Sequence, residues 1–176
     1  MIDGQPSQPD QPSPPGAPPR APGGGLPWWR DGLRFTCTQC GNCCSGPPGA
    51  VWFTEPEGQA MADALRMQLP DFLRLFARQI DGRWSLTERA GPRGMDCVLL
   101  DRESQPGKAL CRVYQARPAQ CRTWPFWQRN LVSRDAWQRA AADTPCHGMG
   151  SGNFFPADAI VERLRAEQAG EAGARW

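Results

Sequence analysis

The sequence predicts an α+β fold: a small single domain with short helices and a few short strands, irregular around its cysteines. Its 176 residues fit one domain of ordinary size. Apolar residues follow helical spacing in some segments and short strand-like runs in others, and none of these segments is long. Eight cysteines, four of them in the stretch "CTQCGNCC", are expected to interrupt regular structure where they gather.

Composition divides the chain into three parts. Residues 1–25 contain eight prolines and five glycines, which cannot build a core and predict a disordered tail. Residues 26–155 begin abruptly with "LPWWRDGLRF" and form the predicted cysteine-cluster domain. Residues 156–176 are predicted to be a C-terminal helix and tail.

The first predicted helix follows a short buried strand expected at "AVWF". Thr54 and Glu57 form the pattern of a capping box, in which two side chains satisfy free N–H groups at a helix start. Apolar residues then continue at helical spacing; these are Met61, Ala64, Leu65 and Leu69.

A second helix is expected to start near Pro70 and Asp71. Its apolar face recurs at steps of three and four, in Phe72, Leu73, Phe76 and Ile80. Asp81-Gly82 then marks a turn. "RWSL" and "CVLL" are strand candidates, and the polar "DRESQPGKA" has the character of a hairpin connection.

Three further helical segments are expected after Cys111. "RVYQA" can form about one turn before Pro118, because the residue before a proline disfavours the helical region. Ser133 is placed to cap a helix that carries Trp137, Ala140 and Ala141. Ile160, Val161 and Leu164 indicate the last helix.

The cysteines are expected to bind metal and so to staple the domain. The predicted ligands are Cys37, Cys40, Cys43, Cys44, Cys97, Cys111, Cys121 and Cys146. Tight Cys-x-x-Cys turns deliver ligand pairs, and distant segments complete a tetrahedral site. Gly41 allows the sharp turn that this requires. Disulfides and free core thiols are the alternatives, and vicinal cysteines such as Cys43 and Cys44 rarely bridge each other. We expect Cys44 to face a second centre.

Charge and targeting signals indicate few other partners. The formal net charge is +2 and arginines are interspersed with acids, so no nucleic-acid partner is expected and a nucleic-acid zinc module ranks last. "MIDGQPSQPD" lacks the basic and apolar regions of a secretory signal, and no segment approaches the ~20 apolar residues of a membrane span. We expect a cytoplasmic protein without membrane contact, where disulfides rarely persist.

The ordered series of cysteine motifs resembles a known family. The run Cys-x-x-Cys-Gly-x-Cys-Cys, followed by "CVLL", "CRVYQARPAQCRTWPF" and "CHGMG", is similar to the bacterial YkgJ-type cysteine-cluster family, the CxxCxxCC proteins, which are described as zinc- or iron-chelating domains or Fe-S oxidoreductases. The resemblance covers about residues 34–150, and all eight cysteines fall on the family's eight. His147 stands where many relatives have proline, which makes it a candidate extra ligand.

The sequence leaves the metal open between an iron-sulfur cluster and zinc. Four thiolates around either Zn²⁺ or an oxidised [4Fe–4S] cluster leave a net −2 charge, and Arg112, Arg117 and Arg122 are candidates to neutralise it from beside the ligands. The resemblance and the aromatic run after Cys121 favour iron. The predicted function is metal chelation through the eight cysteines. The alternative is an iron-sulfur oxidoreductase or electron-transfer protein that uses one centre catalytically.

Overall fold

The computed structural model describes residues 26–176 of the chain, so the predicted disordered tail at 1–25 lies outside the described residues. The α+β prediction is confirmed, because short helices and short strands alternate along the chain. The helices are α1 (Glu55–Ala64), α2 (Leu69–Phe76), α3 (Ala119–Thr123), α4 (Gln128–Leu131), α5 (Arg134–Asp143) and α6 (Ala157–Ala172), with 3₁₀ turns η1 (Asn42–Cys44) and η2 (Tyr114–Ala116).

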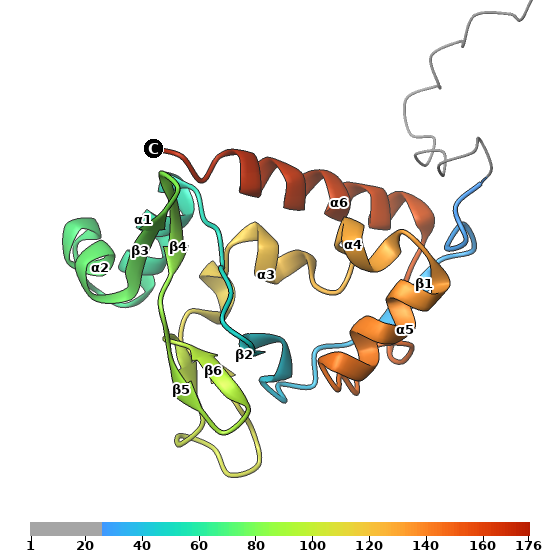
Figure 1. Ribbon diagram of the computed structural model, residues 1–176, viewed down its shortest axis with the longest axis horizontal. Helices are drawn as coiled ribbons and strands as arrows, with labels where there is room; N and C mark the ends of the chain where they lie inside the picture. The colour runs from blue at the N-terminus through green and yellow to red at the C-terminus, as the bar shows by residue number, and fades with distance from the viewer. Residues whose placement is uncertain (1–25) are drawn as a thin grey trace, which may run out of the picture.

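All the strand pairs in the described part of the chain are antiparallel and short. The strands are β1 (Leu33–Phe35), β2 (Ser45–Gly46), β3 (Ala77–Ile80), β4 (Arg83–Leu86), β5 (Glu88–Gly91), β6 (Gly94–Cys97), β7 (Leu100–Asp101), β8 (Leu110–Cys111) and β9 (Asn153–Phe155). They pair as β1–β9, β2–β6–β5, β3–β4 and β7–β8. In Figure 1, α6 runs along one edge above α3 and α4, with α1, α2 and the β3–β4 hairpin at one end and α5 at the other.

The helix α1 begins at the capping box that the sequence predicts. Thr54 Oγ1 accepts a hydrogen bond from the Glu57 amide at 3.4 Å, and Glu57 Oε2 accepts one from the Thr54 amide at 3.0 Å. The cap of α5 is also confirmed, since Ser133 Oγ accepts from the Ala136 amide at 3.0 Å. Both helices therefore start where their sequence signals place them.

The second helix is shorter than its apolar spacing suggests. α2 ends at Phe76, and Ile80 lies in β3, which pairs with β4 across the Asp81–Gly82 turn. Asp81 has φ 50° and Gly82 has φ 72°, and two such left-handed residues suit a hairpin turn whose twist matches its strands. The expected turn is confirmed. Residues 77–80, which the apolar spacing assigned to the second helix, form the first strand of the hairpin instead.

Two strand predictions need correction. "AVWF" contributes only an isolated bridge between Trp52 and Ser85, because the Ser85 side chain replaces a backbone partner and accepts from the Val51 amide at 3.0 Å. "CVLL" is divided by a turn, with Cys97 at the end of β6 and Leu100 at the start of β7. "RWSL" forms β4, and "DRESQPGKA" lies in the β7–β8 connection, as predicted.

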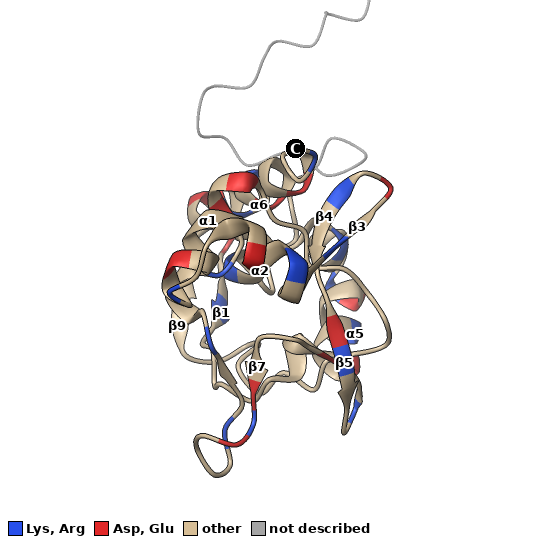
Figure 2. Cartoon of the chain, turned by 90° about the vertical axis from the view of Figure 1, so that its left-hand side faces the viewer, with Lys and Arg blue, Asp and Glu red and all other residues tan. Residues whose placement is uncertain are grey.

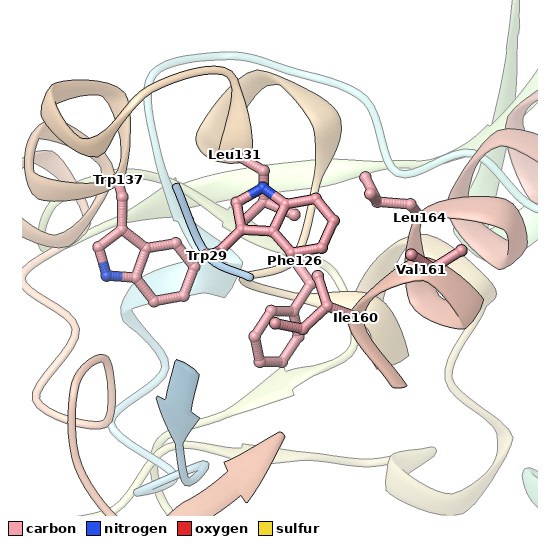
Figure 3. Close-up of a cluster of buried hydrophobic side chains, with 7 residues drawn as sticks. All are labelled: Trp29, Phe126, Leu131, Trp137, Ile160, Val161 and Leu164. Carbon is pink, nitrogen blue, oxygen red and sulfur yellow. The ribbon is translucent and has the colours of Figure 1, made fainter. Parts of the chain in front are cut away.

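The hydrophobic core has two parts. The α5–α6 cluster consists of Trp29, Phe126, Leu131, Trp137, Ile160, Val161 and Leu164, and Figure 3 shows these side chains gathered between the chain segments that carry them. The α1–α2 cluster consists of Phe53, Met61, Ala62, Phe72, Leu86, Leu99 and Val113. The two clusters are joined beyond α6, where the Trp176 ring packs against Phe53 at 6.3 Å between ring centroids. Helix α6 thus ties both parts into one domain.

Within residues 26–176, no helix combines the length and the apolar character that crossing a membrane requires. Figure 2 shows acidic and basic residues interspersed over α1, α2, α5 and α6 on the face that it presents.

Candidate metal centre

The pairing of β2 with β6 brings the "CTQCGNCC" segment beside Cys97. Ser45 is opposite Asp96 in this antiparallel ladder, so Cys44, one residue earlier, lies next to Cys97, one residue later. Gly41 caps the start of the 3₁₀ turn η1, which precedes β2, and its backbone has a φ of 71°. A Cβ atom added to Gly41 would lie 2.5 Å from the Ala109 Cβ. The turn therefore requires glycine at this position.

A second contact places the same segment against β8. The Ala109 amide donates to the Gln39 carbonyl at 2.9 Å, and Ala109 directly precedes the strand that ends at Cys111. Cys111 is in turn opposite Leu100 in the β7–β8 pair. These hydrogen bonds bring the first cysteines of the run alongside a cysteine some seventy positions later.

Helix α3 is held over this region by Gln120. Its Oε1 accepts from the Trp52 amide at 2.8 Å, and its Nε2 donates to the Ala50 carbonyl at 3.1 Å. Glu57 fixes the start of the same helix, since its Oε1 accepts from the Ala119 amide at 2.7 Å. These contacts place Cys121, the next residue of α3, against the cysteine run.

The result is a thiol pocket, which has a volume of about 60 Å³. It is lined by Cys37, Gln39, Gly41, Cys43, Cys44, Val51, Ala109, Cys111, Tyr114, Arg117, Gln120, Cys121, Trp124 and Trp127. All eight cysteines are free, and only Cys43 is exposed. Val51 and Cys111 pack on the α1–α2 cluster, while Phe126 of the α5–α6 cluster lies between Trp124 and Trp127 in the sequence. The α1–α2 cluster therefore packs against one side of the thiol pocket.

The vicinal pair Cys43 and Cys44 lies at one cavity, and the expectation that Cys44 faces a second centre stays a prediction. Both residues line the thiol pocket, and their Sγ atoms are 3.9 Å apart. The reason is the short 3₁₀ turn η1, which ends with both cysteines and turns them toward the same cavity.

Three of the predicted ligands lie outside the lining of the thiol pocket. Cys97 remains close enough for its thiol to raise the pKa of Cys44 and of Cys121. Cys40 and Cys146 are on adjacent segments, since Asn42 Nδ2 donates to the Pro145 carbonyl at 2.9 Å. The side chain of His147, the candidate extra ligand, is exposed.

Burial opposes ionisation of three of the cysteine thiols. It raises the pKa of Cys97 to about 11, and it raises the pKa values of Cys111 and Cys121, with the neighbouring thiols adding to the effect. The hydrogen bond between the Cys43 and Cys44 thiols lowers the pKa of Cys43 and raises that of Cys44 well above its usual value. A bound metal has to displace the thiol protons, so affinity should fall as pH falls.

Of the three arginines predicted to neutralise the charge of the metal centre, only Arg117 lines the thiol pocket. Its positive charge lowers the pKa values of Cys43, Cys111 and Cys121 against the effect of burial. The guanidinium lies 3.7 Å above the Tyr114 ring, and its Nε donates to the Tyr114 carbonyl at 2.9 Å.

The other two arginines contact different parts of the domain. Arg122 pairs with Glu57 at 3.3 Å and donates to the Arg117 carbonyl. Arg112 lies 5.7 Å from the centre of the Phe76 ring. Both side chains are exposed, and neither belongs to the lining of the thiol pocket.

Sequence reasoning missed Arg102, which fixes the end of the cysteine run. Arg102 donates to both carboxylate oxygens of Asp96, at 2.7 and 3.0 Å, and to Ser45 Oγ at 2.6 Å. The Arg102 hydrogen bonds lower the pKa of Asp96, which is 2% exposed. Asp96 directly precedes Cys97, and Ser45 directly follows Cys44. The position of both partners beside cysteines is the sequence feature that could have indicated their role.

The donor set fits a metal that prefers sulfur. Thiols converge on one cavity beside a positive guanidinium, and a volume of about 60 Å³ exceeds the ~10–15 Å³ that a single water requires. Within residues 26–176, no three His, Cys, Asp or Glu side chains stand close enough to hold a metal ion as they are placed. Coordination therefore requires the thiols to turn inward, because zinc binds sulfur at about 2.3 Å.

Comparison with known protein families identifies the domain that carries the cysteines. A family model described as "CxxCxxCC: Putative zinc- or iron-chelating domain" matches residues 36–147, a range that contains all eight cysteines. No solved structure was found to match the chain.

Proposed function

Because the chain belongs to the CxxCxxCC family of zinc- or iron-chelating domains, we propose that the thiol pocket is its metal-binding site. Cys37, Cys43, Cys44, Cys111 and Cys121 would supply thiolate ligands, and Cys97 lies within reach of the same centre. Ligation by Cys40 and Cys146 remains a prediction of the sequence pattern. A reducing compartment such as the cytoplasm would keep these thiols available.

One observation carries this proposal: five cysteines from three separate chain segments line a single small cavity. The segments are the cysteine run before and within η1, the end of β8, and α3. Thiols that are delivered from distant segments to one point are typical of metal sites. Burial opposes ionisation of Cys111 and Cys121, and a metal would supply the positive charge that stabilises thiolate ligands.

We favour an iron-sulfur cluster over zinc as the bound group. The pocket has more thiols than the four that one structural zinc uses, and Trp124 and Trp127 form an aromatic wall, 7% and 8% exposed, that limits access of water. A bound cluster would supply one-electron chemistry, while the chain's residues hold it, neutralise its charge and exclude water.

Anaerobic purification tests both the site and the metal. We expect at least one thiolate-bound metal per chain, with iron, acid-labile sulfide and broad absorption near ~400 nm for a cluster. Colourless protein containing zinc would keep the chelating function and replace iron-sulfur by a structural site. Folded protein without metal, in which all eight cysteines react with a thiol reagent, would contradict the proposal.

Electron transfer is the second candidate function, and the exposure of Cys43 favours it. Cys43 is exposed while it also lines the pocket, so a centre bound through it would lie near the surface, where a redox partner could approach. Reversible reduction and reoxidation of the anaerobically purified protein, followed by its visible absorption, would support this role. A centre that degrades on reduction would argue for a structural role instead.

Replacement of Arg117 should weaken metal binding through the loss of its charge. We expect Arg117→Gln to reduce affinity by about 10-fold or more, in the range typical for residues that support metal ligands. Without the guanidinium, the pKa values of Cys43, Cys111 and Cys121 rise further, so the pH at which metal binds half-maximally should increase. Competition with a chelator across a pH series measures both quantities.

Two variants show whether charge is the cause. Arg117→Lys keeps the positive charge and should retain most of the affinity, whereas Arg112→Gln removes an exposed charge outside the pocket lining and should leave affinity unchanged. Equal losses in Arg117→Gln and Arg112→Gln would show that only the overall charge of the protein matters.

A further inference from the structure

The indole N–H of Trp124 is a buried hydrogen-bond donor that nothing in the described part of the chain satisfies. Trp124 is 7% exposed, and its Nε1 is a buried side-chain polar atom without a hydrogen-bond partner within residues 26–176. A buried donor left without an acceptor is destabilising, and such groups are rare in folded proteins. The position therefore calls for an acceptor that is supplied by something other than these residues.

Other tryptophans in the domain show how the chain normally satisfies this group. Trp127 also lines the thiol pocket and packs edge-on against Trp124, with ring centroids 4.7 Å apart, yet its indole N–H donates to the Gln120 carbonyl at 2.8 Å. Trp28 donates to the Leu131 carbonyl at 2.8 Å. Within residues 26–176, the backbone thus supplies acceptors to comparable indoles and supplies none to Trp124.

The surroundings of Trp124 indicate the chemistry of the missing acceptor. It lines the thiol pocket, whose lining is rich in cysteine. A neutral thiol is a weak acceptor, whereas sulfur bound to a metal carries negative charge and accepts more strongly. Hydrogen bonds to such sulfurs stabilise the bound centre and tune its potential.

We propose that Trp124 Nε1 donates a hydrogen bond to a metal-bound sulfur in the thiol pocket. Trp124 is then a positioning residue that acts on the centre through its sulfur ligands. This inference rests on the proposed metal site and goes beyond it, because it assigns a specific donor to the bound centre. If the centre is an iron-sulfur cluster, the donated hydrogen bond should also raise its reduction potential, since it stabilises the more negative reduced state.

Loading of the wild-type protein with Cd²⁺, a diamagnetic ion that prefers sulfur, tests the hydrogen bond directly. In protein with ¹⁵N-labelled indole groups, the Trp124 N–H signal should move downfield and exchange more slowly with solvent when Cd²⁺ binds. The Trp127 signal is the internal control and should change little, because its acceptor is already present. An unchanged Trp124 signal in Cd²⁺-loaded protein would overturn the inference.

Substitution of Trp124 by phenylalanine gives the second measurement. Trp124→Phe keeps an aromatic ring and removes the donor, and we expect about 10- to 100-fold weaker Cd²⁺ binding in competition with a chelator. Trp28→Phe removes an indole donor that lies in the α5–α6 region and should bind as wild type does. Equal Cd²⁺ affinity of wild type and Trp124→Phe would contradict the proposed Trp124 hydrogen bond and would leave the proposed metal site unaffected. Wild-type protein that binds no Cd²⁺ would overturn the proposed metal site as well.

Discussion

Removal of the metal under reducing, anaerobic conditions should lower the melting temperature of the protein by at least about 10–20 °C. Structural zinc contributes ~10–16 kcal/mol in small metal-dependent domains, and loss of even about 5 kcal/mol shifts melting by this amount in a domain of 150–250 residues. Differential scanning calorimetry of loaded and stripped protein measures the change.

The structure indicates which elements should respond to metal removal. The cysteine run, the β2–β6 pair and the β7–β8 pair are short elements, with β2, β7 and β8 only two residues long each. Strands this short contribute little stability alone. The α5–α6 cluster instead has its own buried aromatic side chains. We therefore expect hydrogen exchange to accelerate in the cysteine-bearing strands of stripped protein, and to accelerate much less in α6.

The control for this experiment is chelator treatment followed by return of the metal. Restored melting and restored exchange protection would show that the chelator acts by removing metal. A cooperative melt that is unchanged after complete stripping, verified by elemental analysis, would contradict the claim that metal holds the fold. The hydrophobic clusters would then suffice for stability, and the centre would be functional only.

Sequence reasoning predicted the elements whose start or turn carries a local signal. The capping box at Thr54 and Glu57, the cap at Ser133 and the Asp81–Gly82 turn each depend on residues adjacent in sequence. The end of α2 could not be predicted in this way. Its apolar spacing continues to Ile80, and the pairing of β3 with β4 decides between helix and strand.

The candidate site shows the same division between local and long-range information. The cysteine types and their tight spacing indicated metal binding from the sequence. Which thiols share a cavity depends on the β2–β6 register and on the contacts of Gln120, and both join segments that lie about fifty or more positions apart. That Cys43 and Cys44 line the same cavity could not be predicted for this reason, and a second centre for Cys44 stays a prediction.

The lack of a hydrogen-bond partner for the Trp124 indole N–H within residues 26–176 could not be predicted either. From the sequence, Trp124 is only part of the aromatic run after Cys121, and the state of its N–H depends on the absence of a hydrogen-bond acceptor within residues 26–176. The pairing of Arg102 with Asp96 and Ser45 is likewise a product of folding, although both partners are adjacent to cysteines in the sequence.

Cys121→Ser should cause the largest loss of metal among single cysteine substitutions, and Cys146→Ser should cause much less. Cys121 lines the thiol pocket from α3, and the thiols of Cys97, Cys43 and Cys111 all raise its pKa, which indicates a position among them. Its loss removes a candidate ligand, so affinity should fall by more than the ~10–100-fold typical for supporting residues. Metal content after anaerobic purification and chelator competition provide the measurements.

Cys146→Ser is the matched control, because Cys146 is also free and partly buried but lies outside the lining of the thiol pocket. Each variant should be melted with and without metal. The stripped forms of both should melt close to stripped wild type, since serine nearly preserves the size of cysteine, and a difference that appears only in the loaded state identifies lost coordination. Equal metal loss in the two variants would place Cys146 at the same centre. Full metal content in Cys121→Ser would place the centre elsewhere than in the thiol pocket.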